Sequence, residues 1–298
     1  MKLFYCHIPD GNFGDELNTY LWPRLLPDAF GGTVQFRPKS TPYVELDDPA
    51  ETLFVGIGTL IGDFVPATAV KHVFGSGYGY GKAPTMDGNW NIHCVRGPLT
   101  ADALGLAPDK AIADPAILVR LLQSKPFAKV HSCSFIPHWE MALSGDWERV
   151  CGFLGINYID PRWPPAKVIR HIAQTRTLIT EALHGAIVAD ALRVPWIPVS
   201  SYHMILPFKW QDWCRSVGLD YRPTSVPAFW KPKPGTLGPI VNAAKDVQAA
   251  LALSYLARWG RPQLSRDGVI DTLTDRLVGS LSSFCKARNL TLNTSPQP

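Results

Sequence analysis

The feature that most constrains this fold is a short apolar strand followed at once by a polar turn and an amphipathic helix. It is clearest at Thr177–Thr180, where the apolar run leads into Glu181 and His184 and then into a helical stripe of apolar residues. The same order recurs after residues 3–6 and after residues 91–95. Repeated strand–turn–helix units predict an α/β fold with parallel sheets. In such folds the turns that follow the strands share one edge, where ligands bind.

Two of these turns carry candidate functional groups. His184 falls in the first turn of its helix, where free backbone N–H groups and the helix dipole favour an anion. The alternative is that His184 and Glu181 only cap the helix. The N-terminal turn holds Asn12, Gly14 and Asp15, which combine short polar groups with a glycine that permits close approach. Its alternative is a capped helix after a tight turn.

Three further residues lie at the ends of predicted strands or the start of a helix. Arg96 follows the strand 91–95, and an arginine there can bind phosphate or carboxylate through two parallel hydrogen bonds. A surface ion pair is the alternative for Arg96. His138 ends the strand 130–136, with a buried structural histidine as its alternative, and Lys209 begins a later helix.

Two glycine clusters, at residues 56–62 and 75–81, also follow predicted strands. Neither has the Gly-x-Gly-x-x-Gly spacing of a dinucleotide site, and the chain has no Gly-Lys-Ser/Thr phosphate loop, so a nicotinamide or ATP enzyme is disfavoured. Their place at the sheet edge suits backbone contact with a ligand, for which Gly58 and Gly77 are the candidates. Generic turns are the alternative.

Five segments together resemble the polysaccharide pyruvyltransferase family, and within it the bacterial exopolysaccharide ketal pyruvyltransferases. The resemblance runs in order from about residue 3 to about residue 213. Its motifs are residues 11–18, 95–100, 114–116, 135–138 and 183–185. The resemblance implies two Rossmann-like domains facing a cleft, as in the GT-B arrangement. It also implies phosphoenolpyruvate as donor with no cofactor, and an oligosaccharide acceptor, which we expect to be lipid-linked.

This donor implies a set of site residues. The site needs cations or helix N-termini for phosphate and carboxylate, an acid for the methylene carbon and a base for the sugar hydroxyls. The catalytic candidates are His184, Glu181, Asp15 and, as the competing acid, His138. The substrate-binding candidates are Asn12, Gly14, Gly58, Gly77, Arg96, Gly185 and Lys209. No metal site is expected.

One position departs from the family pattern. Many members carry an arginine two residues before the histidine, whereas this chain has Ala182. Either the anion-binding role of that arginine passes to another cation, or the donor pocket differs. The candidates are Arg96, Arg162, Arg193 and Lys209.

The chain is expected to divide into an N-terminal α/β domain (1–125), a smaller C-terminal α/β domain (126–221) and a tail (222–298). The tail begins as a proline-rich connector and continues as two amphipathic helices, near residues 239–259 and 264–289. We expect their apolar faces to pack back on the body, with membrane contact through Arg258, Trp259 and Arg261 as the alternative. These faces consist of Ile240, Ala244, Val247, Leu251 and Tyr255, and of Val269, Leu273 and Leu277.

Composition limits the remaining function classes. The formal net charge is +4 and no basic run is present, which disfavours nucleic-acid binding. The 6 cysteines are far apart, so reduced thiols are expected rather than disulfides or a metal cluster. No leader is evident, and no apolar run approaches the roughly 20 residues of a spanning helix. We therefore expect a cytoplasmic protein, with peripheral contact at the inner face of the membrane as the open alternative.

Two other functions stay open at this point. A GT-B glycosyltransferase that uses a nucleotide sugar fits the same architecture, because fold does not determine function. A non-catalytic glycan-binding protein is the second, since several tryptophans suit stacking on sugar rings. Those tryptophans are Trp90, Trp139, Trp163, Trp210 and Trp213.

Overall fold

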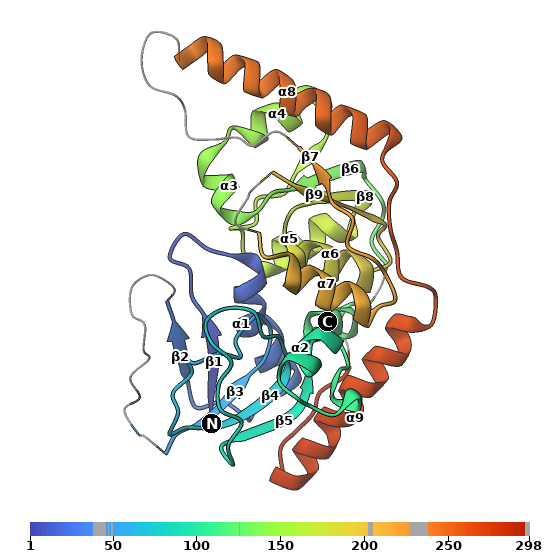
Figure 1. The fold of residues 1–298 in the computed structure, drawn as a ribbon. Coiled ribbons are helices and arrows are strands. Elements are labelled where there is room, and N and C mark those ends of the chain that lie inside the picture. The colour runs from blue at the N-terminus through green and yellow to red at the C-terminus, as the bar shows by residue number, and fades with distance from the viewer. Residues whose placement is uncertain are drawn as a thin grey trace.

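The computed structural model describes residues 1–37, 46, 48, 50–124, 126–201, 205–226 and 238–295. Within them lie two parallel five-stranded sheets, drawn one above the other in Figure 1. The first comprises β1 (Lys2–Cys6), β2 (Thr33–Phe36), β3 (Thr52–Val55), β4 (Val70–Ser76) and β5 (Trp90–Val95). The second comprises β6 (His131–Ile136), β7 (Asn157–Tyr158), β8 (Thr175–Thr180), β9 (Trp196–Ser200) and β10 (Thr224–Ser225).

Helices connect and cover these strands, which confirms the α/β class. Those beside the first sheet are α1 (Phe13–Leu25), α2 (Pro98–Ala103) and two 3-10 helices, η1 (Pro108–Lys110) and η2 (Pro115–Leu122). Those of the second are α3 (Trp139–Ser144), α4 (Trp147–Leu154), α5 (Pro165–Ala173), α6 (Leu183–Ala191) and α7 (Pro207–Ser216). Two long helices end the chain, α8 (Gly238–Trp259) and α9 (Val269–Arg288). No described helix combines the length and apolar character needed to cross a bilayer.

The two sheets share one strand order. The first runs β2-β1-β3-β4-β5, and the second runs β7-β6-β8-β9-β10, which is the same 2-1-3-4-5 order. In a doubly wound sheet of this order, ligands bind at the carboxyl ends of the two strands where the winding direction reverses. These strands are β1 and β3 in the first sheet, and β6 and β8 in the second. The fold is consistent with two Rossmann-like domains.

A continuous apolar core joins the two sheets. One cluster of buried side chains includes Leu17 and Leu21 of α1, Ile117 of η2 and Ile187 of α6. Here α1 contacts α5 and α6, η2 contacts α6, and α2 contacts α7; we call this set of contacts the junction. The predicted boundary at residue 125 falls outside the described residues; η2, beside the first sheet, ends at Leu122, and β6 of the second sheet begins at His131. The two halves are therefore held together by packing as well as by the chain.

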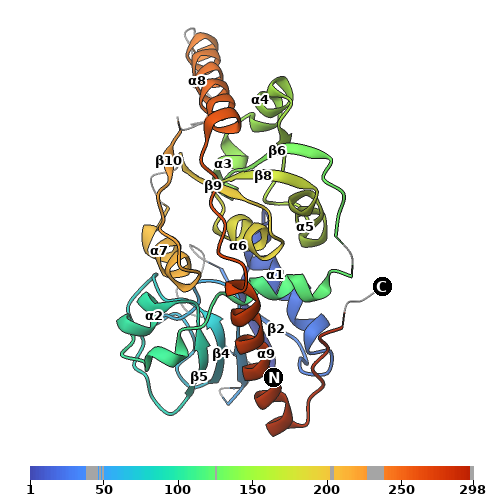
Figure 2. The same cartoon turned by 90° about the vertical axis from the view of Figure 1, so that its right-hand side faces the viewer.

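The two tail helices behave differently from each other. Leu273 and Leu277 of α9 are buried against the first sheet and η2, as predicted, so the chain returns to its N-terminal half (Figure 2). The prediction for α8 was wrong. Ala249, Leu253 and Leu256 form its buried face, whereas the predicted face is exposed. The mistake arises because α8 is apolar on both sides, so the pattern alone does not tell which side packs. Of the predicted connector, residues 227–237 lie outside the described residues.

A histidine pair lies where the end of α9 meets the first sheet. His72 Nδ1 and His93 Nε2 are 3.1 Å apart, and Arg288 of α9 approaches His72 Nε2 at 2.7 Å. Burial, together with the Arg288 charge, lowers the pKa of both histidines to about 4. Both imidazoles are therefore neutral in the folded protein at neutral pH.

Acidification is expected to loosen α9. Below an ordinary histidine pKa of about 6.5 the unfolded chain takes up protons that the folded cluster excludes, so stability falls as pH drops toward about 4. Hydrogen exchange of α9 amides and the melting temperature, measured across this range, test the expectation. Arg288→Met should weaken the pH dependence, because that charge contributes to both shifts. A profile that stays flat down to pH of about 4 would contradict this account.

Candidate active site

Residues from the reversal points of both sheets meet at the junction. His184 is in the first turn of α6, after β8, and Gly14 is in the first turn of α1, after β1. A Cβ atom at Gly14 would overlap the imidazole of His184, so only glycine permits this contact. Asn12 caps α1 by accepting a hydrogen bond from the Gly14 backbone. The local signals that start the two helices thus place the predicted residues of separate sheets side by side.

Asp114 stands behind His184. It caps η2 by accepting a hydrogen bond from the backbone of Ala116, and its other oxygen lies 3.5 Å from His184 Nε2. The Asp114 side chain is fully buried, while that of His184 remains 14% exposed. Both atoms are buried and neither has a hydrogen-bond partner among the described residues, so their ion-pair approach leaves both free to bind a further polar group. Sequence reasoning noted residues 114–116 only as a motif and missed this role.

A second carboxylate, that of Asp15, also belongs to the cluster. Asp15 accepts a hydrogen bond from Asn12 Nδ2 at 2.6 Å. Burial raises the pKa of Asp15, and the charges of His184 and Lys209, with the Asn12 hydrogen bond, oppose the rise. Three predicted residues, Asp15, His184 and Lys209, are therefore close enough to interact electrostatically. A carboxyl group with a raised pKa is suited to exchanging protons.

His138 also joins the cluster. It precedes α3, at the end of β6. Burial and the nearby charge of Lys209 lower the pKa of His138 to about 3, although Glu140 acts in the other direction. The imidazole of His138 is therefore neutral near pH 7, which makes it a poor source of protons and a suitable hydrogen-bonding group.

Glu181 ties the loops of the second sheet together. Its carboxylate accepts hydrogen bonds from the His138 backbone at 3.1 Å and from the Ser201 backbone and hydroxyl. Glu181 is 1% exposed. These contacts join the ends of β6, β8 and β9, so the geometry favours positioning of His138 as the role of Glu181.

Arg96 forms an ion pair across the junction. Its Nε lies 3.1 Å from Asp212 of α7, and its Nη1 donates to Thr59 at 3.0 Å. The same carboxylate accepts hydrogen bonds from the backbone and hydroxyl of Thr100. Arg96 and Asp212 are both fully buried, and a Cβ at Gly77 would overlap the guanidinium. The structure thus places Arg96 where it holds α7, the helix that carries Lys209, and direct anion binding by Arg96 stays a prediction.

The other cations proposed to replace the family arginine are occupied or distant. Arg162 pairs with Asp160 through two nitrogens. Arg193 lies beyond the far end of α6 and pairs with Asp267. Lys209 forms no ion pair within the described residues, and its charge acts on both Asp15 and His138.

The remaining candidates are glycines whose observed contacts are within the fold. Gly58, with a φ of +126°, accepts a hydrogen bond from the Gly77 backbone, so the two glycine turns are joined. Gly185 lets α6 pack closely on Thr180 and Ile136. Substrate contact by these glycines stays a prediction.

The tryptophans proposed to stack on sugar differ in exposure. Trp210 and Trp213 are buried in the core, so they cannot stack on a sugar, while Trp139, next to His138, and Trp163 are partly exposed. The described residues contain no group of three or more His, Cys, Asp or Glu side chains placed to hold a metal.

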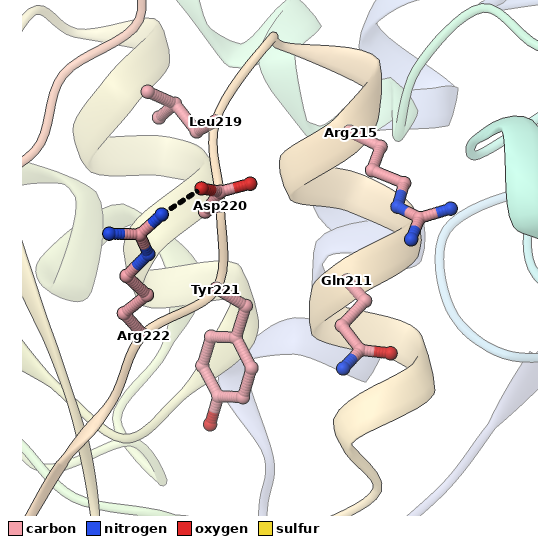
Figure 3. A pocket seen from close by; sticks show the side chains of 6 residues that line it. All are labelled: Gln211, Arg215, Leu219, Asp220, Tyr221 and Arg222. Atoms are coloured by element: carbon pink, nitrogen blue, oxygen red, sulfur yellow. Dashed lines mark hydrogen bonds and ion pairs between the residues drawn. The ribbon is translucent and has the colours of Figure 1, made fainter.

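A cavity of about 200 Å³ lies between α7 and the segment after it (Figure 3). Its walls include Gln211 and Arg215 of α7 and an ion pair between Arg222 and Asp220. Gln211 lies roughly 200° around the helix from Lys209 at 3.6 residues per turn. Gln211 and Lys209 therefore lie on different sides of α7, and none of the residues lining this cavity belongs to the set predicted for the site.

Comparison with known proteins assigns the family. Residues 12–203 match the family model for polysaccharide pyruvyl transferase. The chain belongs to this family. It is also 45% identical, over 231 residues, to the succinoglycan biosynthesis protein ExoV of Rhizobium meliloti (strain 1021), in a match that covers 76% of this chain and 68% of that protein. The protein is thus a pyruvyltransferase. Residues 12–203, which match the family model, contain every predicted site residue except Lys209.

The contact between Gly14 and His184 yields a sharp test. Gly14→Ala should lower pyruvyltransferase turnover by about 100-fold or more, because the added methyl displaces the imidazole. The helix itself should tolerate the change, since alanine favours helices. The matched control is Gly279→Ala in α9, where a Cβ meets open space. Equal turnover of the two variants would show that His184 need not occupy this position.

Proposed function

We propose that this pyruvyltransferase moves the pyruvyl group of phosphoenolpyruvate to a sugar of an exopolysaccharide repeat unit, forming a pyruvate ketal and releasing phosphate. The observation that carries the proposal is the His184–Asp114 pair at the start of α6, with Lys209 and Asp15 beside it. The name of the relative, a succinoglycan biosynthesis protein, supports an exopolysaccharide acceptor.

The chemistry defines what these groups must do. Protonation of the methylene carbon converts it to a methyl group and leaves a cation-like centre at the neighbouring carbon. Two hydroxyls of one sugar attack that carbon in turn, and the carbon–oxygen bond to phosphate breaks. Of the two hydroxyl protons, one balances the proton given to carbon and the other leaves with phosphate. The site therefore needs an acid, a base and a cationic environment.

His184 is the acid in this scheme. The second carboxylate oxygen of Asp114 lies 3.5 Å from Nε2 and orients the imidazole, as the aspartate does in other His–Asp pairs. His138 is the weaker candidate, because its low pKa of about 3 leaves it uncharged near neutrality. His138 then contributes a hydrogen bond to the substrate.

The start of α6 and Lys209 bind the anionic donor. Ala182, the residue before α6, offers no side-chain cap, so N–H groups of the first turn are available to phosphate or carboxylate. Lys209 supplies the positive charge that an arginine at position 182 would bring. Arg96 acts through Asp212 to hold α7 in place.

Asp15 is the base that accepts a proton from the sugar. Its raised pKa and its hydrogen bond from Asn12 suit a group that takes and returns protons. Trp139 is partly exposed beside His138 and provides an aromatic surface for the acceptor. Family membership favours this reaction over both glycosyl transfer and non-catalytic glycan binding.

The direct test uses purified protein, phosphoenolpyruvate and lipid-linked or synthetic oligosaccharides. Phosphate release together with a glycan mass gain of one pyruvate less one water is the expected result. His184→Ala should reduce turnover by about 100-fold or more, since loss of a general acid has that effect. Asp114→Asn should also reduce turnover, with little change in KM. A His184→Ala variant that keeps more than about a tenth of wild-type turnover would rule out the acid role.

The pH dependence tests Lys209 and Asp15 together. Lys209 lowers the pKa of Asp15, so Lys209→Met should raise that pKa and move the acidic limb of the kcat/KM profile to higher pH. Lys286→Met, at an exposed site in the last turn of α9, is the control and should leave the limb in place. If the acidic limb of Lys209→Met is unchanged, the group that titrates there is not Asp15.

A further inference from the structure

A row of exposed apolar side chains runs along α8. Successive members are seven or four residues apart, which places them on one face of the helix. Each is between 58% and 69% exposed: Ile240, Val247, Leu251, Tyr255 and Trp259. On the opposite face, Ala249, Leu253 and Leu256 are buried in a core cluster of the second sheet. The helix is therefore fixed to the body with an apolar face turned outward.

The neighbouring helix also exposes an apolar side chain. Phe153 of α4 is 86% exposed, and α4 packs against α8. Figure 1 shows α8 lying along the outer end of the molecule, far from α9 and the first sheet. Single exposed apolar residues are common, but a continuous row marks a contact surface. We call the α8 row and Phe153 the outer face.

The charges of α8 indicate what contacts this face. Its one carboxylate, Asp246, pairs with Arg149 of α4. Arg258 is exposed and lies over the ring of Trp259, 5.6 Å from its centre. Arg258 forms no ion pair among the described residues, and a second copy of this chain packed on α8 would bring another such arginine to the same dry interface, which is costly.

An anionic lipid surface is complementary to the positive charge of this face. Phosphate groups can pair with Arg258 and with Arg261, which follows the helix, while the arginine stems and the rings of Tyr255 and Trp259 suit the depth of the headgroups. The aliphatic side chains then reach the acyl boundary. Because its other face is held by the protein, α8 lies in the plane of the bilayer.

We propose that the outer face docks this protein on an anionic phospholipid bilayer. The proposal is independent of the reaction assigned above, because no outer-face residue belongs to the cluster around His184. It places the enzyme at the surface where a lipid-linked glycan would be found.

Vesicle flotation of the full chain tests the proposal. The protein should float with vesicles of phosphatidylglycerol and phosphatidylcholine, bind pure phosphatidylcholine much more weakly, and be released by salt. Leu251→Glu should reduce binding to the anionic vesicles by about tenfold or more, because it places a charge in the apolar row. Val130→Glu, at another exposed apolar residue outside α8, is the matched control. Equal melting temperatures establish that both variants fold.

Three results would overturn the proposal. The first is no flotation of the wild type, and the second is equal binding by Leu251→Glu and Val130→Glu. The third is a dimer, measured by light scattering, that Leu251→Glu dissociates, because a second copy would then cover the outer face. None of these results bears on phosphate release or glycan modification, so the reaction is judged separately.

Discussion

The rest of this structure depends on the packing of His184 against the backbone of Gly14. Each residue follows a strand at which the winding of its own sheet reverses, so the contact brings two ligand-binding edges together. A continuous apolar core and the buried Arg96–Asp212 pair fix this arrangement. Neither sheet carries the full set of the proposed acid, base and cation, so the proposed site exists only where the two meet.

Much of the fold could be predicted because its signals are local. Apolar runs, turn glycines and helix caps act within a few residues, so the strands up to residue 200 and the long tail helices were predicted near their true positions. The pairing of Gly14 with His184 was not predictable from spacing, although both residues were. Their motifs identified the family, and the family implied that they share one site.

Longer-range contacts explain what the sequence could not predict. Asp114 is 70 residues from His184, and Arg96 meets Asp212 across a separation of 116 residues. Asp114 precedes a proline and Asp212 lies in an amphipathic helix, and neither neighbourhood in the sequence indicates the residue that it pairs with. The buried side of α8 was likewise ambiguous, since both of its faces are apolar and only tertiary packing distinguishes them.

The central claim is that a group at this junction protonates the methylene carbon of the donor before the sugar attacks. Reaction in D2O, followed by mass spectrometry of the modified glycan, measures that step directly. The account predicts one solvent deuteron in the methyl group of each transferred pyruvyl unit, formed at a rate that falls sharply in His184→Ala. A glycan that gains the pyruvyl unit without solvent deuterium in its methyl group would contradict it.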